Sequence, residues 1–441
     1  MSSLARFFIS IGAEVAGYDR APSVITDALL KLSASIHFED KPELIPDSFK
    51  NNPDQTLVVY TPAVPDNHAE LNYFINNGFT VQKRAAVLGT IANEKRGIAV
   101  AGTHGKTSVS TIITTILNEW EQGCSAFLGG ISKNFGNNYI ASAKSDFVVL
   151  EADEFDRSFL QLTPEFAIIT AIDPDHLDIY KSYNELISTF NQFISLIKRG
   201  GSLLVNRKVL RLIKVPDYVK LFTYSITEEA DFTAINIIAE EGRFRFDVAT
   251  ANHEVMNDIE FGLPGRINVE NALAALAMSR IIGVENDIII EQLKEFKGVI
   301  RRFDIQVRNN ATIYIDDYAH HPEELNSTIN SVRELYPEKK ITGIFQPHLY
   351  SRTSDFALDF AESLSLLDKL YMLDIYPARE EPIPGVTSDL ILKDVALDEK
   401  LLCKKEDIVE LIDKDRPEIL LTLGAGDIDQ LVLPLKELLL N

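Results

Sequence analysis

The sequence has few cysteines and no long uninterrupted apolar segment. Its 441 residues include only two cysteines, Cys124 and Cys403, which are far apart in the chain. Two distant cysteines argue against a disulfide scaffold, give no metal-site spacing and suit a reducing cytoplasm. No apolar run reaches the roughly 18 residues that a membrane helix needs. The sequence therefore predicts a cytoplasmic protein without membrane insertion.

The sequence also has too few basic residues to balance its acidic ones. Lys and Arg number 43 against 65 Asp and Glu, which gives a formal net charge of −22. This charge argues against a general nucleic-acid or anionic-membrane binder, and no nucleic-acid partner is expected. An anionic small molecule is compatible with it, because a few backbone N–H groups and one or two cations can hold a phosphate.

What the sequence does contain is typical of a multidomain α/β protein. Hydrophobic residues make up 46% and charged residues 24%, and the length predicts two to three domains. Apolar strand-like runs alternate with amphipathic helix-like stretches. The main expected strands are Glu14–Tyr18, Thr56–Tyr60, Gly97–Val100, Phe147–Leu150, Phe166–Thr170, Ser202–Val205, Thr312–Ile315, Ile341–Phe345, Lys369–Leu373 and Ile419–Leu423.

A glycine-rich loop lies between the expected strand Gly97–Val100 and a helix. Glycines allow backbone N–H groups to approach phosphate oxygens, a lysine supplies charge at the β- and γ-phosphates, and the next hydroxyl can bind Mg²⁺. The match to the usual phosphate loop is imperfect, because Val100 stands where its first glycine would be. The residues expected to bind ATP phosphates are Gly102, Thr103, His104, Gly105, Lys106, Thr107 and Ser108.

Acidic residues and a histidine follow two other expected strands. The run Phe147–Leu150 leads to Glu151, and Phe166–Thr170 leads to His176. A carboxylate at the end of a buried strand beside a phosphate loop is a candidate Mg²⁺ ligand. Taken alone, the same residue is better explained as a solvated acidic turn. Five of the eight histidines occupy such strand-end loops, namely His104, His176, His320, His321 and His348.

Two loops of the last third of the chain also follow expected strands. Thr312–Ile315 leads to Asp316–Pro322, and Ile341–Phe345 leads to Gln346–Thr353. Open α/β sheets bind ligands beyond the carboxyl ends of their strands. Arg352 in the second loop is suited to hold a carboxylate through paired hydrogen bonds. Ordinary surface loops are the alternative explanation.

Together these motifs resemble those of the Mur ligase family. The segments that carry the resemblance are Gly102–Thr107, Glu151–Glu154, Asp175–Asp178, Asn268–Asn271 and Arg301–Phe303. Within the family, the alanine-adding branch is the most similar, as judged from Asp316–Pro322, Gln346–His348 and Pro382–Ser388. The resemblance spans nearly the whole chain, and the set is far more specific than any one motif.

The resemblance implies three domains. These are a Rossmann-like UDP-binding domain at residues 1–88, a central P-loop ATPase domain at 89–299, and a Rossmann-like amino-acid-binding domain at 300–441. It also implies that ATP, with Mg²⁺, phosphorylates the lactyl carboxylate of UDP-N-acetylmuramate, after which the amine of L-alanine attacks the acyl phosphate. The protein is expected to be a monomer or homodimer that acts in peptidoglycan synthesis.

The resemblance assigns the catalytic roles to four residues. Lys106 bridges the β- and γ-phosphates, and Arg302 meets the γ-phosphate. Thr107 holds a first Mg²⁺, while Glu151 and His176 hold a second one beside the substrate carboxylate.

The remaining implied contacts concern the base, the sugar and the two substrates. Asn271 would touch adenine and Asp317 the ribose. The residues expected around L-alanine are Tyr318, His320, His348 and Arg352. The residues expected to contact UDP are Asp19, Thr61, Ala63 and Arg84.

Some positions depart from the family pattern. Ile267 replaces a histidine that often precedes the asparagine at 268, and Leu349 replaces an arginine of some relatives. No lysine lies between Tyr183 and Ile197, where sister enzymes carry a carbamylated one, and this favours the alanine-adding branch. The chain also starts where the family's first strand and glycine turn would end. We therefore expect a longer natural chain, and an unpaired position in the first sheet.

Two alternatives remain at this point. A sister ligase or a muropeptide-recycling ligase would share most of these motifs. A non-catalytic sugar-nucleotide-binding protein would share the fold. The missing first glycine loop favours it, whereas the intact Lys106, Thr107, Glu151 and His176 argue against it.

Overall fold

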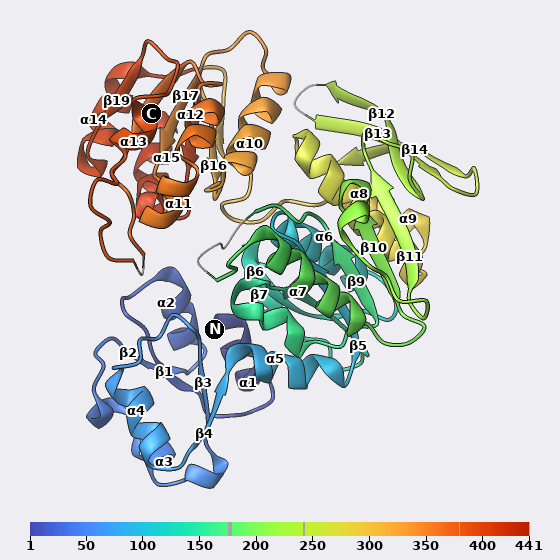
Figure 1. The fold of residues 1–441 in the computed structure, drawn as a ribbon, viewed down its shortest axis with the longest axis vertical. Coiled ribbons are helices and arrows are strands. Elements are labelled where there is room, and N and C mark those ends of the chain that lie inside the picture. The colour runs from blue at the N-terminus through green and yellow to red at the C-terminus, as the bar shows by residue number, and fades with distance from the viewer. Residues whose placement is uncertain (175–178, 241–242, 379, 441) are drawn as a thin grey trace. The chain divides into compact units, whose positions relative to one another are not determined.

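The computed structural model describes residues 1–174, 179–240, 243–378 and 380–440 (Figure 1). The chain divides into two compact units, the first containing residues 1–232 and 274–292 and the second containing residues 233–273 and 293–441. Both units combine helices with β-sheets, which confirms the predicted α/β class. Within the described ranges, no helix is both long enough and apolar enough to cross a membrane.

The segment before the phosphate loop forms two small parallel sheets. Strands β1 (Ala16–Tyr18) and β2 (Ser35–His37) pair in one sheet, and β3 (Leu57–Tyr60) and β4 (Thr80–Lys83) pair in the other. No further strand of the described chain joins either sheet. The helices of this segment are α1 (Ser2–Ser10), α2 (Val24–Lys31), α3 (Asp47–Lys50), α4 (Ala69–Asn76) and α5 (Arg84–Asn93).

The largest sheet has ten strands, seven of them in the first unit. These seven follow one another in the order β11-β10-β9-β5-β8-β6-β7, and all neighbours are parallel except β6 and β7. The phosphate loop follows β5, in the middle of this order. The elements are β5 (Arg96–Ala101), α6 (Lys106–Asn118), β6 (Ser125–Ser132), β7 (Asn137–Ile140), β8 (Phe147–Ala152), β9 (Phe166–Ile169), α7 (Tyr183–Ser195), β10 (Ser202–Asn206) and β11 (Lys220–Ser225).

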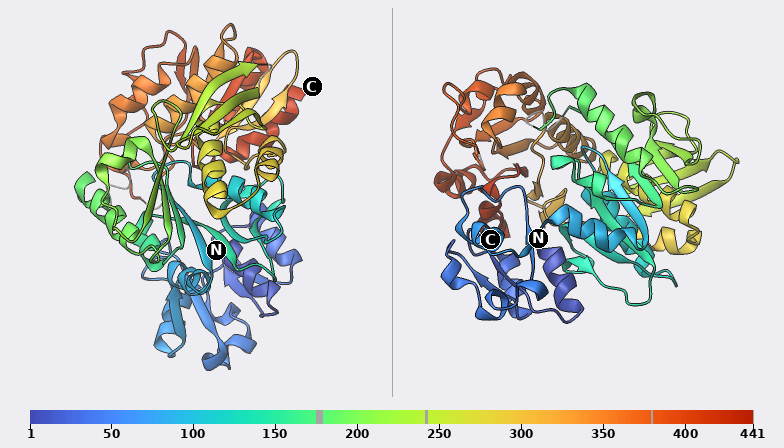
Figure 2. Two further views of the ribbon diagram at one scale, coloured as in Figure 1. Left: turned by 90° about the vertical axis from the view of Figure 1, so that its right-hand side faces the viewer. Right: turned by 60° about the horizontal axis from the view of Figure 1, so that its bottom comes forward.

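Helices cover both faces of these seven strands (Figure 2). Helix α6 packs against β5, β6 and β8. On the opposite face, residues of α5 and α7 join a buried cluster with alternate strand residues, for example Ala99 and Ala101 of β5. A parallel sheet buried on both faces has no polar side, so its strands are continuous apolar runs. This explains why the runs at 97–100 and 147–150 could be recognised in the sequence.

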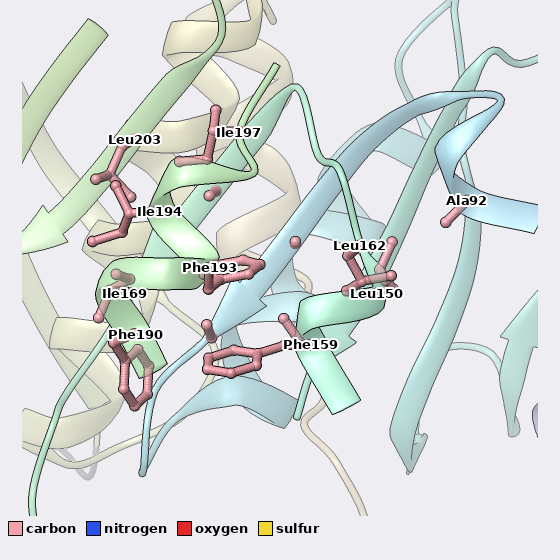
Figure 3. Close-up of a cluster of buried hydrophobic side chains, with 14 of the residues drawn as sticks. Ala92, Leu150, Phe159, Leu162, Ile169, Phe190, Phe193, Ile194, Ile197 and Leu203 are labelled. Atoms are coloured by element: carbon pink, nitrogen blue, oxygen red, sulfur yellow. The ribbon is translucent and has the colours of Figure 1, made fainter. Parts of the chain in front are cut away.

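A group of phenylalanine rings fixes the chain after β8. Figure 3 shows Phe159, from the 3₁₀ segment Phe155–Gln161, beside Phe190 and Phe193 of α7. The rings of Phe159 and Phe193 are nearly parallel with centroids 4.8 Å apart, and Phe190 meets Phe159 edge-on at 5.2 Å. All three side chains are fully buried. This packing anchors the segment that directly follows the acidic end of β8.

The second unit contains most of the last three strands of the large sheet and a separate six-stranded sheet. The six strands have the order β15-β16-β20-β17-β18-β19, and only β15 is antiparallel to its neighbour. The strands are β12 (Phe232–Glu240), β13 (Arg243–Thr250), β14 (Val255–Phe261), β15 (Asp304–Arg308), β16 (Ile313–Asp317), β17 (Ile341–Phe345), β18 (Lys369–Met372), β19 (Lys400–Leu402) and β20 (Ile419–Leu423). The helices are α8 (Arg266–Ile282, which continues into the first unit), α10 (Pro322–Leu335), α11 (Tyr350–Asp355), α12 (Ala357–Leu364), α13 (Asp389–Leu392), α14 (Ile408–Asp415) and α15 (Val432–Leu440). Helix α9 (Asn286–Lys294) belongs mostly to the first unit.

Alternate residues of the six-stranded sheet enter two different apolar clusters. Ile313 and Ile315 of β16 belong to the cluster that includes α10 and α12. Tyr314, between them, belongs to the cluster that includes α14 and α15. Helices on both faces of a mostly parallel sheet are the Rossmann-like arrangement predicted for the last part of the chain.

Candidate active site

The phosphate loop connects β5 to α6, as the sequence predicts. Gly105, with φ 82°, is the N-cap residue of α6 and has no side chain to cap the helix. The first backbone N–H groups of α6 are therefore suited to receive an anion. Gly102 has φ 134°, and a Cβ atom there would collide with Oγ1 of Thr170 and lie 2.9 Å from the backbone N of Ala171. Glycine is required at both positions, as in a loop that wraps closely around phosphate.

The same loop is fastened to the chain that follows β9. The hydroxyl of Thr103 accepts a hydrogen bond from the backbone N of Asp173 at 3.1 Å. His104 Nε2 lies 3.7 Å from a carboxylate oxygen of Asp173, and the Thr170 hydroxyl donates to the carbonyl oxygen of His104. These contacts fasten the phosphate loop to the segment that follows β9. Thr103 and His104 thus have structural roles in addition to the ATP contacts expected of them.

Lys106, the expected phosphate-binding lysine, forms a buried ion pair with Glu154. Its ammonium donates to the two carboxylate oxygens of Glu154 at 2.9 and 2.8 Å, and to the carbonyl oxygen of Gly102 at 2.7 Å. The Glu154 side chain is 0% exposed and that of Lys106 is 15% exposed. Sequence reasoning included Glu154 in a motif but gave it no role, since nothing local connects it to a lysine 48 positions earlier.

Burial and charge act in opposite directions on this pair. Burial raises the pKa of Glu154 to about 7, although the nearby ammonium of Lys106 lowers it. For Lys106, burial lowers the pKa, but the carboxylates, with Glu154 as the strongest and Asp153 next, raise it overall. Lys106 therefore keeps its proton throughout the neutral range, as a phosphate-binding cation must.

Glu151, an expected metal ligand, is held against the neighbouring strand β6. The backbone N of Gly129 donates to Oε1 of Glu151 at 3.0 Å. A Cβ atom on Gly129 would lie 2.5 Å from Oε1 and 2.6 Å from Cδ of Glu151. The carboxylate thus occupies the space that a side chain at 129 would fill. Gly129 was not recognised from the sequence, and it fixes where the carboxylate lies.

The donors near the phosphate loop fit a magnesium ion. Thr107 and Glu151 supply the hydroxyl and carboxylate oxygens that Mg²⁺ prefers. Thr107 lies in the first turn of α6, after β5, and Glu151 lies near the end of β8. The strands β5 and β8 are neighbours, with Val100 opposite Glu151. His176, the third expected ligand, lies outside the described residues. In the part of the chain that the structure describes, no three His, Cys, Asp or Glu side chains form a metal cluster. The expected ligands are Thr107, Glu151 and His176. One of them is a threonine and another lies outside the described residues, so this ligand set stays a prediction.

In the second unit, Asp317 is the last residue of β16 and contacts the loop that carries Arg302. The guanidinium of Arg302 stands over the Tyr318 ring at 4.8 Å, and Nη1 is 3.9 Å from the carboxylate of Glu324. Asp317 accepts hydrogen bonds from the backbone N of Phe303 and of Ala319, both at 2.9 Å. Burial raises the pKa of Asp317 to about 6, opposed by Arg302. Asp317 therefore fixes the loop that carries Arg302.

Four rings form a row along the loops that follow β16, β17 and β18. Tyr318 and His320 are 5.2 Å apart, His320 and His348 are 5.9 Å apart, and His348 and Tyr376 are 5.9 Å apart and nearly parallel. His320 Nδ1 also lies 3.1 Å from a carboxylate oxygen of Glu324. The structure thus brings together three residues that were expected around L-alanine. Tyr376 and Glu324 are neighbours that sequence reasoning missed.

Arg352, the fourth residue expected around L-alanine, lies in α11 and is 6% exposed. The preceding Leu349 has φ 70°, a conformation that costs energy for a leucine. Its backbone N donates to the carbonyl oxygen of Tyr376 at 3.0 Å, while the N of Tyr376 donates to that of Pro347 at 2.8 Å. These two backbone hydrogen bonds hold the strained turn at Leu349. They thereby fix the position of His348 and of the start of α11.

For the residues expected to contact adenine and UDP, the structure gives positions in the fold and does not test the expected contacts. Asn271 is buried in α8, and the nearby Asn268 donates to the carbonyl oxygen of Pro264 at 2.6 Å. In the first segment, Asp19 follows β1 and its backbone N donates to the carbonyl oxygen of His37. The others lie after β3 or at the start of α5, namely Thr61, Ala63 and Arg84.

Sequence profiles of one family match the chain in three consecutive parts. Residues 1–96 match the profile described as "Mur ligase family, catalytic domain", residues 100–279 the "Mur ligase middle domain", and residues 301–426 the "Mur ligase, glutamate ligase domain". The chain belongs to the Mur ligase family.

Several curated relatives that match nearly the full chain carry the same enzyme name. The chain is 50% identical to the UDP-N-acetylmuramate–L-alanine ligase of Parabacteroides distasonis, across 100% of this chain and 95% of that protein. It is 48% identical to the ligase of the same name from Porphyromonas gingivalis, across 100% and 96%. The crystal structure of the UDP-N-acetylmuramate-alanine ligase from Thermotoga maritima matches with a TM-score of 0.81 at 27% identity, covering 99% of this chain and 96% of that one. The three-domain architecture and the family expected from the motifs are confirmed.

Proposed function

We propose that this protein joins L-alanine to the lactyl carboxylate of UDP-N-acetylmuramate, using ATP, in the synthesis of peptidoglycan precursors. The observation that carries the proposal is the full-length identity of up to 50% with ligases of that name. The presence of Lys106, Thr107 and Glu151 in a formed phosphate site supports an active enzyme over a binding protein.

The chemistry explains why a ligase needs such a site. A carboxylate does not acylate an amine until one of its oxygens becomes part of a leaving group. In the proposed reaction a lactyl carboxylate oxygen attacks the γ-phosphorus of ATP, and ADP departs. The amine of L-alanine then attacks the acyl carbon and loses a proton, and phosphate leaves with the carboxylate oxygen. The site must concentrate positive charge around a phosphoryl group that passes between anions.

We assign the phosphate-binding work to the first unit and to Arg302. The N-terminus of α6 and Lys106 would hold the β- and γ-phosphates, and Arg302 would meet the γ-phosphate. Thr107 would hold a first Mg²⁺, and Glu151 with His176 would hold a second one beside the substrate carboxylate. Bound Mg²⁺ would neutralise phosphate charge. Because Lys106 is largely desolvated, its interaction with phosphate is stronger than it would be in water.

We assign recognition of the nucleoside and of the amino acid to the second unit. Asn271 would contact adenine. Asp317 would contact the ribose, since its backbone partners leave one lone pair on Oδ1. The side chains that would surround L-alanine are Tyr318, His320, His348 and Arg352. Those that would contact UDP in the first segment are Asp19, Thr61, Ala63 and Arg84.

We place the UDP-binding domain at residues 1–88, the ATP-binding domain at 89–299 and the amino-acid-binding domain at 300–441. A cytoplasmic location and a monomeric or homodimeric state complete the proposal. The absence of a cysteine pair close in sequence supports the location, because cytoplasmic enzymes seldom depend on disulfides.

The proposal is tested by measuring phosphate release with ATP and Mg²⁺ while each substrate is omitted in turn. We expect release only when UDP-N-acetylmuramate and L-alanine are both present. Glycine and serine should be poor substrates, because a pocket for one methyl group discriminates by only about 1–3 kcal/mol. Preferred use of D-glutamate, of diaminopimelate or of a preformed peptide would instead identify a sister or recycling ligase.

A further inference from the structure

The ammonium group of Lys106 has no proton left for a phosphate. It carries three protons, and three oxygens accept from it: the two carboxylate oxygens of Glu154 and the carbonyl oxygen of Gly102. A phosphate oxygen can therefore bind Lys106 only if one of these contacts is released or shared. The contact to Gly102 lies within the phosphate loop itself, whereas Glu154 comes from the end of a different strand.

The carboxylate of Glu154 resembles the ligand that the loop is expected to bind. It presents two anionic oxygens to the ammonium at 2.9 and 2.8 Å, as a phosphate would. We propose that Glu154 and a nucleotide phosphate compete for Lys106, and that ATP or ADP must displace the carboxylate to bind there. The carboxylate of Glu154 then competes with nucleotide for Lys106 and lowers the affinity of the site for ATP and ADP.

The backbone of Glu154 is fixed, so only its side chain can withdraw. Its carbonyl oxygen accepts hydrogen bonds from the hydroxyl of Tyr180 at 2.6 Å and from the backbone N of Arg157 at 2.9 Å. Phe159 follows two residues after Arg157 and is packed in the aromatic cluster (Figure 3). After displacement the carboxylate remains close to its starting point and competes again as soon as a phosphate leaves.

Displacement is also unfavourable electrostatically, which gives the competition its strength. Glu154 is fully buried, and Asp153 is a further negative charge beside it. A buried carboxylate that is separated from a paired cation is strongly destabilised. The elevated pKa of Glu154 has the same origin, namely burial opposed by Lys106. Part of the binding energy of the nucleotide is therefore spent on separating this pair.

The test is a direct measurement of ADP affinity on the full chain by calorimetry, with Glu154→Gln compared with the wild type. Glutamine keeps the size of the side chain and removes its charge. We expect ADP to bind roughly 10-fold more tightly, equivalent to about 1.4 kcal/mol, mostly through slower dissociation. Glu154→Ala should shift affinity in the same direction, so a folding defect of one variant does not end the test. Unchanged or weaker binding by folded variants would overturn the proposal.

Two further variants separate this inference from the proposed function on which it rests. Asp156→Asn makes the same charge change in the same segment, but Asp156 pairs with Lys83 at the surface, and its ADP affinity should stay within about twofold of wild type. Lys106→Ala should lose ADP binding. If Lys106→Ala binds ADP normally, the nucleotide site itself is misassigned. If it loses binding while Glu154→Gln gains nothing, only the role of Glu154 is wrong.

Discussion

Replacing Gly129 with alanine should disable the enzyme without unfolding it. The added Cβ would lie 2.5 Å from Oε1 and 2.6 Å from Cδ of Glu151, so the carboxylate must move by roughly 1 Å to reach van der Waals distance. The mutation does not strain the backbone, because φ at Gly129 is not in the left-handed region. The group that must move is the end of a flexible side chain, so the stability cost should be about 1 kcal/mol.

The expected loss of activity is much larger than the loss of stability. If Glu151 holds a metal ion next to the transferred phosphoryl group, a 1 Å displacement should lower kcat by about 100-fold. The assay is phosphate release at several Mg²⁺ concentrations, paired with a thermal unfolding curve. The Mg²⁺ requirement should rise, and the melting temperature should fall by no more than about 4 °C.

Gly97→Ala is the matched control. Gly97 lies in β5 of the same sheet, and its Cβ would meet only ordinary contacts, at 3.5 Å from Cα of Pro164. This variant should keep wild-type kcat and Mg²⁺ dependence. A folded Gly129→Ala enzyme with normal kcat and normal Mg²⁺ dependence would refute the reasoning, because it would show that the observed position of Glu151 does not matter to catalysis.

Three other substitutions and one pH dependence have clear expected outcomes. Lys106→Ala should lower turnover at least about 1000-fold in the phosphate-release assay, because its desolvated ammonium is the cation of the phosphate loop itself. Near-normal turnover would show that Lys106 does not belong to the ATP site. Arg352→Ala should raise the KM for L-alanine about 10- to 100-fold with less than about a twofold change for ATP, and equal changes in both would contradict a carboxylate contact. Phe159→Ala should destabilise the first unit by about 3–5 kcal/mol in denaturant unfolding, whereas a loss below about 1 kcal/mol would contradict the packing in Figure 3. Burial, and then Asp407 and Asp374, raise the pKa of the Cys403 thiol from 9 to about 11, so little thiolate forms at pH 8. Alkylation of Cys403 at pH 8 should therefore be about 100-fold slower than that of a free cysteine, and its rate should rise about tenfold per pH unit. A rate that levels off near pH 9 would contradict the raised pKa.

The parallel strands could be predicted from the sequence because both of their faces are buried. The runs Ile341–Phe345 and Ile419–Leu423 match β17 and β20 residue for residue. The run predicted to end at Leu150 continues to Ala152, because the ladder with β5 extends past Glu151. An apolar composition shows where a buried strand lies, but the pairing with a neighbour determines where it ends.

The strands β12 to β14, of which β13 and β14 are antiparallel, were not predicted. In β13, Phe244, Phe246 and Val248 are buried while Arg243 and Arg245 are exposed, so a period of two was present in the sequence. That signal is weaker than a continuous apolar run, since charged residues interrupt it at every second position.

The sequence predicted individual residues of the candidate site but not the contacts between them. Lys106 and Glu151 could be found because each lies in a local motif at the end of a strand. The contact between Lys106 and Glu154 and the stacking of Tyr376 on His348 join residues that are distant in sequence. No local pattern encodes such pairs, because they depend on which strands become neighbours in the sheet.

The most direct test of the proposed reaction follows one oxygen atom. UDP-N-acetylmuramate labelled with ¹⁸O in both oxygens of its lactyl carboxylate is incubated with the enzyme, ATP, Mg²⁺ and L-alanine, and the released phosphate is analysed by mass spectrometry. If the carboxylate attacks the γ-phosphorus and L-alanine then displaces phosphate, each phosphate should carry one ¹⁸O atom and each new amide should retain the other. Unlabelled phosphate, or labelled phosphate without the alanyl amide, would contradict the acyl-phosphate ligation proposed for this protein.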